Sequence, residues 1–132
     1  MLIENSDAGR GIVIDASGNV TVVRVTSNSS PSPGSASVWA DRYSAGSWSA
    51  PVLIKSGLYG SGVGTPRIAA DPSGNVVAVW HQYDGTRNSI FASRYSAGSW
   101  GTAEPIEMDN VSDANFPQVA VDVNGNAIAV WE

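Results

Sequence analysis

Three aspartates at matching points of a repeated motif are the first residues whose type and spacing could do chemistry. The motif reads Asp-x-x-Gly-Asn, and its aspartates are Asp15, Asp71 and Asp122. A carboxylate in a glycine-containing loop can bind Ca²⁺, but calcium loops gather several acidic oxygens and each of these loops offers one. The alternative is a tight turn in which the aspartate accepts backbone N–H bonds and the glycine is left-handed. We expect the turn, with no metal and no cofactor.

His81 is the only histidine, so any histidine-dependent chemistry must use it. It follows an apolar run and precedes a loop with a glycine turn, where it could bind a ligand or transfer a proton. The competing interpretation, which we favour, is a partly exposed histidine at a strand end. No Ser-His-Asp order, paired-histidine spacing or phosphate-binding glycine loop accompanies it. We therefore predict that the protein is not an enzyme.

Length and composition exclude several further classes. The 132 residues predict one domain, residues 1–132, and no apolar run approaches the ~20 residues of a membrane-spanning helix. The net charge of -5 argues against a nucleic-acid partner, and the absence of cysteine excludes a disulfide scaffold. The first residues lack the pattern of a signal peptide. Localisation stays open: cytoplasmic for the chain as given, extracellular if it belongs to a longer protein.

An internal repeat supplies the elements that position these residues. The Asp-x-x-Gly-Asn motifs lie 56 and 51 residues apart, and Arg-Tyr-Ser-Ala-Gly-Ser-Trp at residues 42–48 returns unchanged at 94–100. Periods of this size are typical of solenoids and propellers. Short runs of Val, Ile, Trp and Tyr between Gly, Asn, Ser and Pro predict β-strands. We expect units at about residues 2–52, 53–105 and 106–132, the last of them incomplete.

Each full unit predicts four strands. We expect first strands at 12–15, 67–71 and 118–122, second at 20–25, 76–81 and 127–131, third at 38–43 and 90–95, and fourth at 48–54 and 100–106. Four strands in about 50 residues match a propeller blade. The second strands run apolar without alternation, as expected where both faces are covered. The fold prediction is all-β, with propeller-type four-stranded antiparallel blades, about 2.5 per chain.

The first unit departs from the others at one core position. Arg24 stands where the later units have Trp80 and Trp131. A guanidinium at this position predicts that this face of the first unit is exposed or packs differently.

On these motifs the chain resembles β-propeller blade repeats. The Asp-x-x-Gly-Asn signature with an upstream Pro66 or Pro117 looks like NHL-type blades. The Ser-Ala-Gly-Ser-Trp turns sit where sialidase-like blades carry their Asp-box, but they lack its aspartate. The nearest resemblance is to uncharacterised bacterial repeats of the form Gly-Asn-Ala-x-Ala-Val-Trp … Arg-Tyr-x-Ala-Gly-x-Trp. The resemblance implies a fold and no activity, and the seven scattered basic residues do not form the arginine cluster of a sialidase.

The loops that differ between units are the expected binding surface. Because successive strands run in opposite directions, the connections between second and third strands lie at the same end of the repeat as the connections between units. The candidate contacts there are Tyr59, His81, Tyr83, Asp84, Arg87, Asp109 and Asp113. They predict a non-enzymatic module that binds a protein or, like a lectin, a carbohydrate. The alternatives are a sialidase-like glycoside hydrolase and a purely structural repeat of a larger bacterial surface protein.

The last expected strand, residues 127–131, predicts self-association. It is apolar and no third strand follows it in the sequence, so its edge would pair with another chain. We expect a homo-oligomer, either two copies across a two-fold axis or several in a ring. The alternative is that the chain is part of a longer propeller, and the match of residues 2–4 to the end of a fourth strand fits a continuous repeat.

Overall fold

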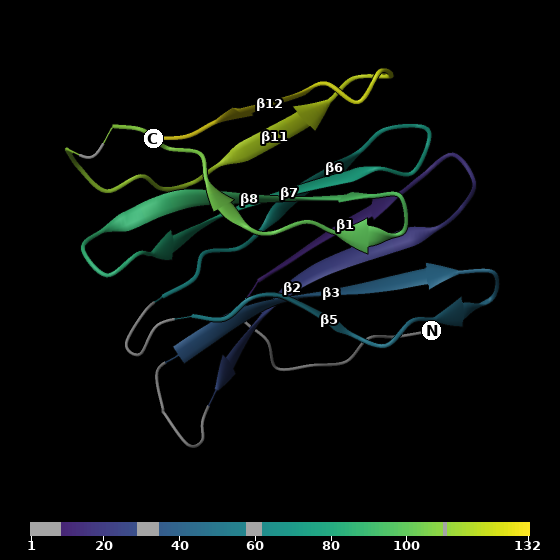
Figure 1. Ribbon diagram of the computed structural model, residues 1–132, viewed down its shortest axis with the longest axis horizontal. Helices are drawn as coiled ribbons and strands as arrows, with labels where there is room; N and C mark the ends of the chain where they lie inside the picture. The colour runs from purple at the N-terminus through teal and green to yellow at the C-terminus, as the bar shows by residue number, and fades with distance from the viewer. Residues whose placement is uncertain (1–8, 29–34, 58–61, 110) are drawn as a thin grey trace.

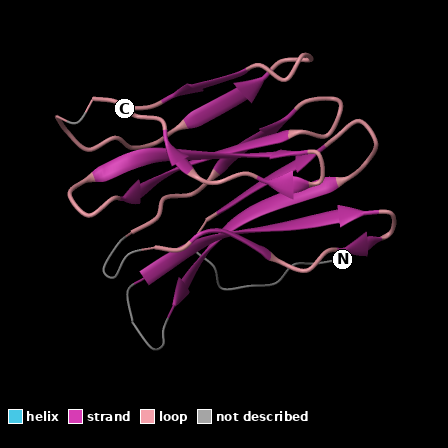
Figure 2. Cartoon of the chain, viewed as in Figure 1, coloured by secondary structure: helices cyan, strands magenta, loops and turns pink. Residues whose placement is uncertain are grey.

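A computed structural model describes residues 9–28, 35–57, 62–109 and 111–132 of the chain (Figure 1). Across these ranges the regular structure is β-strand, and no helix is present (Figure 2). Accordingly, the described residues include no helix that is long and apolar enough to cross a membrane. Residues 2–4, Tyr59 and the Ser-Pro-rich stretch 29–34, on which sequence predictions fall, lie outside the described residues.

The first sheet is antiparallel and contains the first unit. Its strands are β1 (Arg10–Ile14), β2 (Val20–Asn28), β3 (Ser35–Ser44), β4 (Ser47–Trp48) and β5 (Val52–Lys55). They pair in the order β1-β2-β3, and both β4 and β5 pair with β3. The sheet thus has four strand positions, the fourth of which is divided in two.

The second sheet repeats this design, and a hairpin begins a third unit. The strands of the second sheet are β6 (Arg67–Ala70), β7 (Val76–Tyr83), β8 (Asn88–Ser96), β9 (Ser99–Trp100) and β10 (Glu104–Pro105). The hairpin consists of β11 (Gln118–Val121) and β12 (Ala127–Val130). In Figure 1 the three units follow one another across the molecule, with β1, β6 and β11 as neighbouring first strands. The predicted all-β fold of about 2.5 antiparallel four-stranded units is confirmed.

The predicted continuous fourth strands, 48–54 and 100–106, were wrong in one respect. Each is interrupted, at residues 49–51 and 101–103. In the first unit Pro51 has no N–H to donate to a ladder. In the second unit the Ser93 hydroxyl donates to the Gly101 carbonyl at 2.9 Å, so a side chain takes the place of a backbone partner.

The turns between third and fourth strands hold their aromatic residues together. Tyr43 and Trp48 have ring centroids 5.5 Å apart, and Tyr95 and Trp100 have theirs 5.7 Å apart. The predicted aromatic clamp on each hairpin is therefore confirmed. Each turn also holds an alanine in the left-handed region, at φ 50°, directly before a glycine at φ 85°.

Replacing both of these alanines, Ala45 and Ala97, by asparagine is expected to stabilise the protein. Left-handed backbone costs alanine about 1 kcal/mol, and Asn-Gly is the preferred pair for such two-residue turns. Asparagine relieves part of this cost at each turn, so the free energy of unfolding in urea should rise by about 1 kcal/mol in total for the double variant. Ala50→Asn is the control, because Ala50 is exposed and lies outside the left-handed region. An equal gain from the control would contradict this explanation.

The hydrophobic core lies between the first and second sheets. The first sheet contributes Val23, Val38 and Ala40, and the second contributes Ala78, Trp80 and Phe91. The rings of Trp80 and Phe91 stack at 6.3 Å with an interplanar angle of 16°. Because the other face of β7 is also covered, residues 76–80 are all buried, as the unbroken apolar run predicts.

A repeated arginine joins each unit to the next. Arg42 on β3 donates to Thr21 Oγ1 at 2.8 Å and to Asp15 Oδ2 at 3.2 Å, and its guanidinium lies 4.5 Å from the centroid of the Tyr95 ring in the second sheet. Its equivalent, Arg94, donates to the carbonyl of Gly125 in the third unit at 3.0 Å. The Arg-Tyr-Ser-Ala-Gly-Ser-Trp motif thus fixes both a turn and the contact with the neighbouring unit.

The arginine at the exceptional position of the first unit is largely buried. The Arg24 side chain is 13% exposed, and its Nε lies 2.6 Å from Asp41 Oδ2. Of the two predicted alternatives for this face, exposure and different packing, the second is therefore the one found. A buried charge is stable here because an opposite charge on the paired strand accompanies it.

Candidate functional site

The three repeated aspartates close their own turns. Asp71 Oδ1 accepts the Asn75 backbone N–H at 3.0 Å, and its Oδ2 accepts the Asn75 side-chain amide at 2.6 Å. Asp15 and Asp122 accept the same bonds from Asn19 and Asn126. The following glycines, at φ 80–88°, are left-handed as predicted.

These hydrogen bonds stabilise the ionised carboxylates. They lower the pKa of Asp71 and Asp122, chiefly through the side-chain amides of Asn75 and Asn126. Burial raises the pKa of Asp15, but hydrogen bonds from Asn19 and Ser17 and the charge of Arg42 outweigh it, so this pKa is also lowered. The described residues contain no group of three or more metal-ligating side chains.

Predicted contact residues from two different connections lie together at one end of the sheets. The turn between β7 and β8 lies against the segment that leads into β11. The Asn88 N–H donates to Asp113 Oδ1 at 2.8 Å, and the Ala114 N–H donates to the Asn88 carbonyl at 2.9 Å. Asn115 in turn exchanges two backbone hydrogen bonds with Glu132. His81, Tyr83, Asp84, Arg87 and Asp113 therefore share this end of the molecule.

Several of the predicted contact residues are occupied within the fold. Asp84 accepts the Thr86 and Arg87 N–H groups and the Ser89 hydroxyl, and these bonds lower its pKa. The Tyr83 hydroxyl donates to the Gly85 carbonyl at 2.9 Å. Asp109 accepts the Val111 N–H at 3.2 Å. Because these polar atoms are hydrogen-bonded within their own loops, fewer of them are available to bind a ligand.

His81 lies between a glycine and an aromatic ring that the sequence interpretation missed. A Cβ on Gly64 would be 2.1 Å from the imidazole, so the ring packs directly on that glycine. Phe116 meets the imidazole edge-on at 6.2 Å and is 69% exposed, at φ 53°. No periodicity marks Phe116 in the sequence, because it belongs to the irregular segment before β11.

Burial lowers the pKa of His81 and predicts a pH dependence of stability. As the pH falls below about 6.5, the unfolded state takes up a proton more readily than the folded state, so the free energy of unfolding decreases. The decrease should end below the lowered pKa of the folded state. Urea unfolding between pH 7.5 and pH 5 measures it, and His81→Gln should remove it. A slope that persists in the His81→Gln variant would assign the pH dependence to another group.

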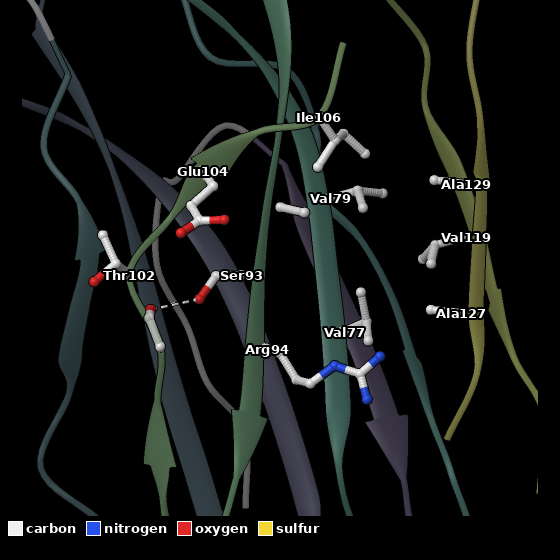
Figure 3. Close-up of a pocket in the computed structure, with 12 residues that line it drawn as sticks. Val77, Val79, Ser93, Arg94, Thr102, Glu104, Ile106, Val119, Ala127 and Ala129 are labelled. Carbon is white, nitrogen blue, oxygen red and sulfur yellow. Dashed lines mark hydrogen bonds between the residues drawn. The ribbon is translucent and has the colours of Figure 1, made fainter. Parts of the chain in front are cut away.

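A pocket of about 470 Å³ lies between the second sheet and the hairpin. Val77 and Val79 of β7 form one wall, and Val119, Ala127 and Ala129 of the hairpin form the opposite wall (Figure 3). Its remaining lining residues are Ala92, Ser93, Arg94, Gly101, Thr102, Glu104 and Ile106. The sequence interpretation did not predict this pocket. The alternating faces of β7 and β12 are its only signal in the sequence.

The pocket opens beside a strand edge that has no neighbour. Among the described residues, β12 pairs only with β11, whereas β7, its equivalent, pairs with both β6 and β8. The Asp122 N–H donates to the Asn126 carbonyl, and antiparallel pairs alternate, so the backbone groups of Ala127 and Ala129 face the free edge. Ile128 and Val130, on the face away from the pocket, are 68% and 58% exposed.

One acidic side chain near this region is buried without a partner. Glu107 is 8% exposed, and neither carboxylate oxygen has a hydrogen-bond partner among the described residues. Burying a carboxylate without a hydrogen bond destabilises a folded protein. A hydrogen-bond donor from a binding partner would remove this destabilisation.

The comparisons with known proteins assign no relationship. No family model matches the chain, and no curated protein matches it.

Proposed function

We propose that the chain is a non-enzymatic interaction module of the propeller type, which binds β-structure of a partner along the free edge of β12. The partner that we propose is a second copy of the same chain. Two copies related by a two-fold axis would place one β12 antiparallel to the other, so that two hairpins form one four-stranded sheet. That sheet has the strand number of the other units.

The observation that carries this proposal is the free edge itself. An edge strand with exposed apolar side chains and outward-facing backbone groups is the surface that pairs with other chains. In β12 the outward-facing groups belong to Ala127 and Ala129, with no proline, lysine or bulge to block approach. The loop end supports binding less well, because Tyr83, Asp84 and Asp113 bond within the fold.

Sedimentation velocity over a range of concentrations tests the proposal. The wild-type chain should form dimers, and Ala129→Pro should yield monomers, because proline removes the outward N–H while an edge strand tolerates its ring. Ala129→Ser keeps the N–H and should still dimerise. A wild-type chain that stays monomeric and folded at about 100 μM would overturn self-association, since it places the dissociation constant well above that range.

A second candidate, a carbohydrate site at the loop end, is favoured by Phe116. Its ring is largely exposed beside His81, and exposed aromatic rings stack on sugars. Glycan-array binding that Phe116→Ala abolishes would support this candidate, and the absence of any bound glycan would remove it.

A further inference from the structure

We propose that the pocket beneath β12 binds a β-hairpin with the sequence pattern of the repeat's own third and fourth strands. This inference rests on the proposed function, because it names the partner that adds to the same edge. The hairpin would lie in the pocket with its first strand paired to β12. Its second strand would pair with the first on the side away from β12.

The contact between the first two sheets shows what fits this surface. Val79, Ala92 and Ile106 of the pocket occupy the repeat positions of Val23, Ala40 and Ile54 in the first sheet. Those three residues belong to or pack against the core, where the second sheet covers them. The covering residues include Phe91, Trp100 and Ala103, which belong to the third and fourth strand positions of the second sheet. Among the described residues the third unit has the strands β11 and β12, and the pocket lies where the third and fourth strands of a full unit would pack.

The register of the docked hairpin follows from that of β7 and β8. Trp80 pairs with Phe91 across these strands, and their rings stack. Trp131 occupies the repeat position of Trp80 and is 38% exposed. An aromatic residue at the Phe91 position of the hairpin would therefore pair with Trp131 and cover it.

Arg94 favours the Arg-Tyr motif in the hairpin. In the first sheet the equivalent Arg42 lies under the ring of Tyr95, which follows the arginine of the second sheet's motif. Arg94 is exposed, with its Nη1 on the Gly125 carbonyl at one end of the pocket (Figure 3). A tyrosine at the same point of the hairpin would cover this guanidinium by a cation–π contact.

Glu107 selects which aromatic residue the hairpin carries. It occupies the repeat position of Lys55, and Lys55 Nζ lies 4.7 Å from the centroid of the Phe91 ring. The Glu107 carboxylate would thus meet the aromatic residue that pairs with Trp131. A carboxylate is repelled by the face of a phenylalanine ring but accepts a hydrogen bond from an indole N–H. The first unit has Trp39 at this position, so its hairpin is the better ligand.

A synthetic peptide of residues 35–56 tests the inference against the full chain. Calorimetric titration should show one peptide bound per chain, and the peptide should displace β12 from the dimer in sedimentation experiments. Ala127→Arg, on the pocket face, should abolish binding, and Ile128→Arg, on the opposite face of the same strand, should preserve it. Changing Trp39 to phenylalanine in the peptide should weaken binding about tenfold, the loss of one hydrogen bond to a charged group. Glu107→Gln in the chain should reduce that difference.

The possible results separate this inference from the proposed function. A chain that dimerises through β12 but shows no saturable peptide binding up to about 1 mM would overturn the hairpin and leave the edge. Equal binding to the Ala127→Arg and Ile128→Arg variants would also overturn it, because the peptide would then bind outside the pocket. Failure of both dimerisation and peptide binding would remove both proposals.

Discussion

Replacing Trp80 by alanine is expected to lower the free energy of unfolding by about 4 kcal/mol. Trp80 is fully buried, stacks on Phe91, and donates its indole N–H to Gln82 Oε1 at 3.0 Å. The variant would leave a cavity in the core and a buried amide oxygen without its donor. Urea unfolding followed by far-ultraviolet circular dichroism measures the change without depending on tryptophan fluorescence.

The repeat supplies a matched control for this substitution. Trp131 stands at the same position of the third unit but is 38% exposed. Trp131→Ala should cost less than about 1 kcal/mol at concentrations where the chain is monomeric. Comparable losses in the two variants would mean that the third unit is covered as fully as the second, which would contradict the free edge.

Gly57→Ala is expected to destabilise the protein by about 3 kcal/mol or to prevent folding. A Cβ at this position would be 1.8 Å from the Ala36 carbonyl oxygen, which is backbone of β3 and cannot rotate away. The segment after β5 would have to leave β3. Thermal unfolding followed by circular dichroism measures the effect.

Two other glycines calibrate that result. Gly64→Ala would bring its Cβ to 2.1 Å from the His81 ring, a side chain that can move, so its cost should be smaller. Gly62→Ala is the neutral control, because no atom of the described residues lies within 4 Å of its Cβ and its φ is not left-handed. We expect the order Gly57, Gly64, Gly62 from most to least destabilising. A neutral Gly57→Ala would show that β3 and the segment after β5 are further apart.

The repeat predicted most of the fold. Turn motifs such as the one at Asp71 predict the local structure directly, because the carboxylate and the glycine each have a specific role in the turn. The apolar run of β7 predicted a strand covered on both faces. The ends of the strands were less predictable: β3 begins at Ser35 rather than residue 38, since serine carries no strong preference and pairing with β2 decides.

The candidate sites were harder to predict. Sequence variability between units pointed to the loop end of the sheets, but it could not show that Asp84 and Asp113 accept hydrogen bonds from neighbouring N–H groups. The pocket beneath β12 depends on which faces of two separate sheets oppose one another. The alternation of side chains along β7 predicts that Val77 and Val79 share one face. Only the packing of the sheets shows that this face lines a pocket.

The arginine contacts between units and the loops of variable length lie at opposite ends of the sheets. Arg42 and Arg94 reach the neighbouring unit at the end where the turns are nearly identical, while the loops of differing length lie at the other end. The repeat interval changes from 56 to 51 residues, and both Arg42 and Arg94 still contact the unit that follows, Arg42 through the Tyr95 ring and Arg94 through the Gly125 carbonyl. Loop residues can therefore be inserted or removed at one end of the sheets while the arginine contact between successive units is kept at the other.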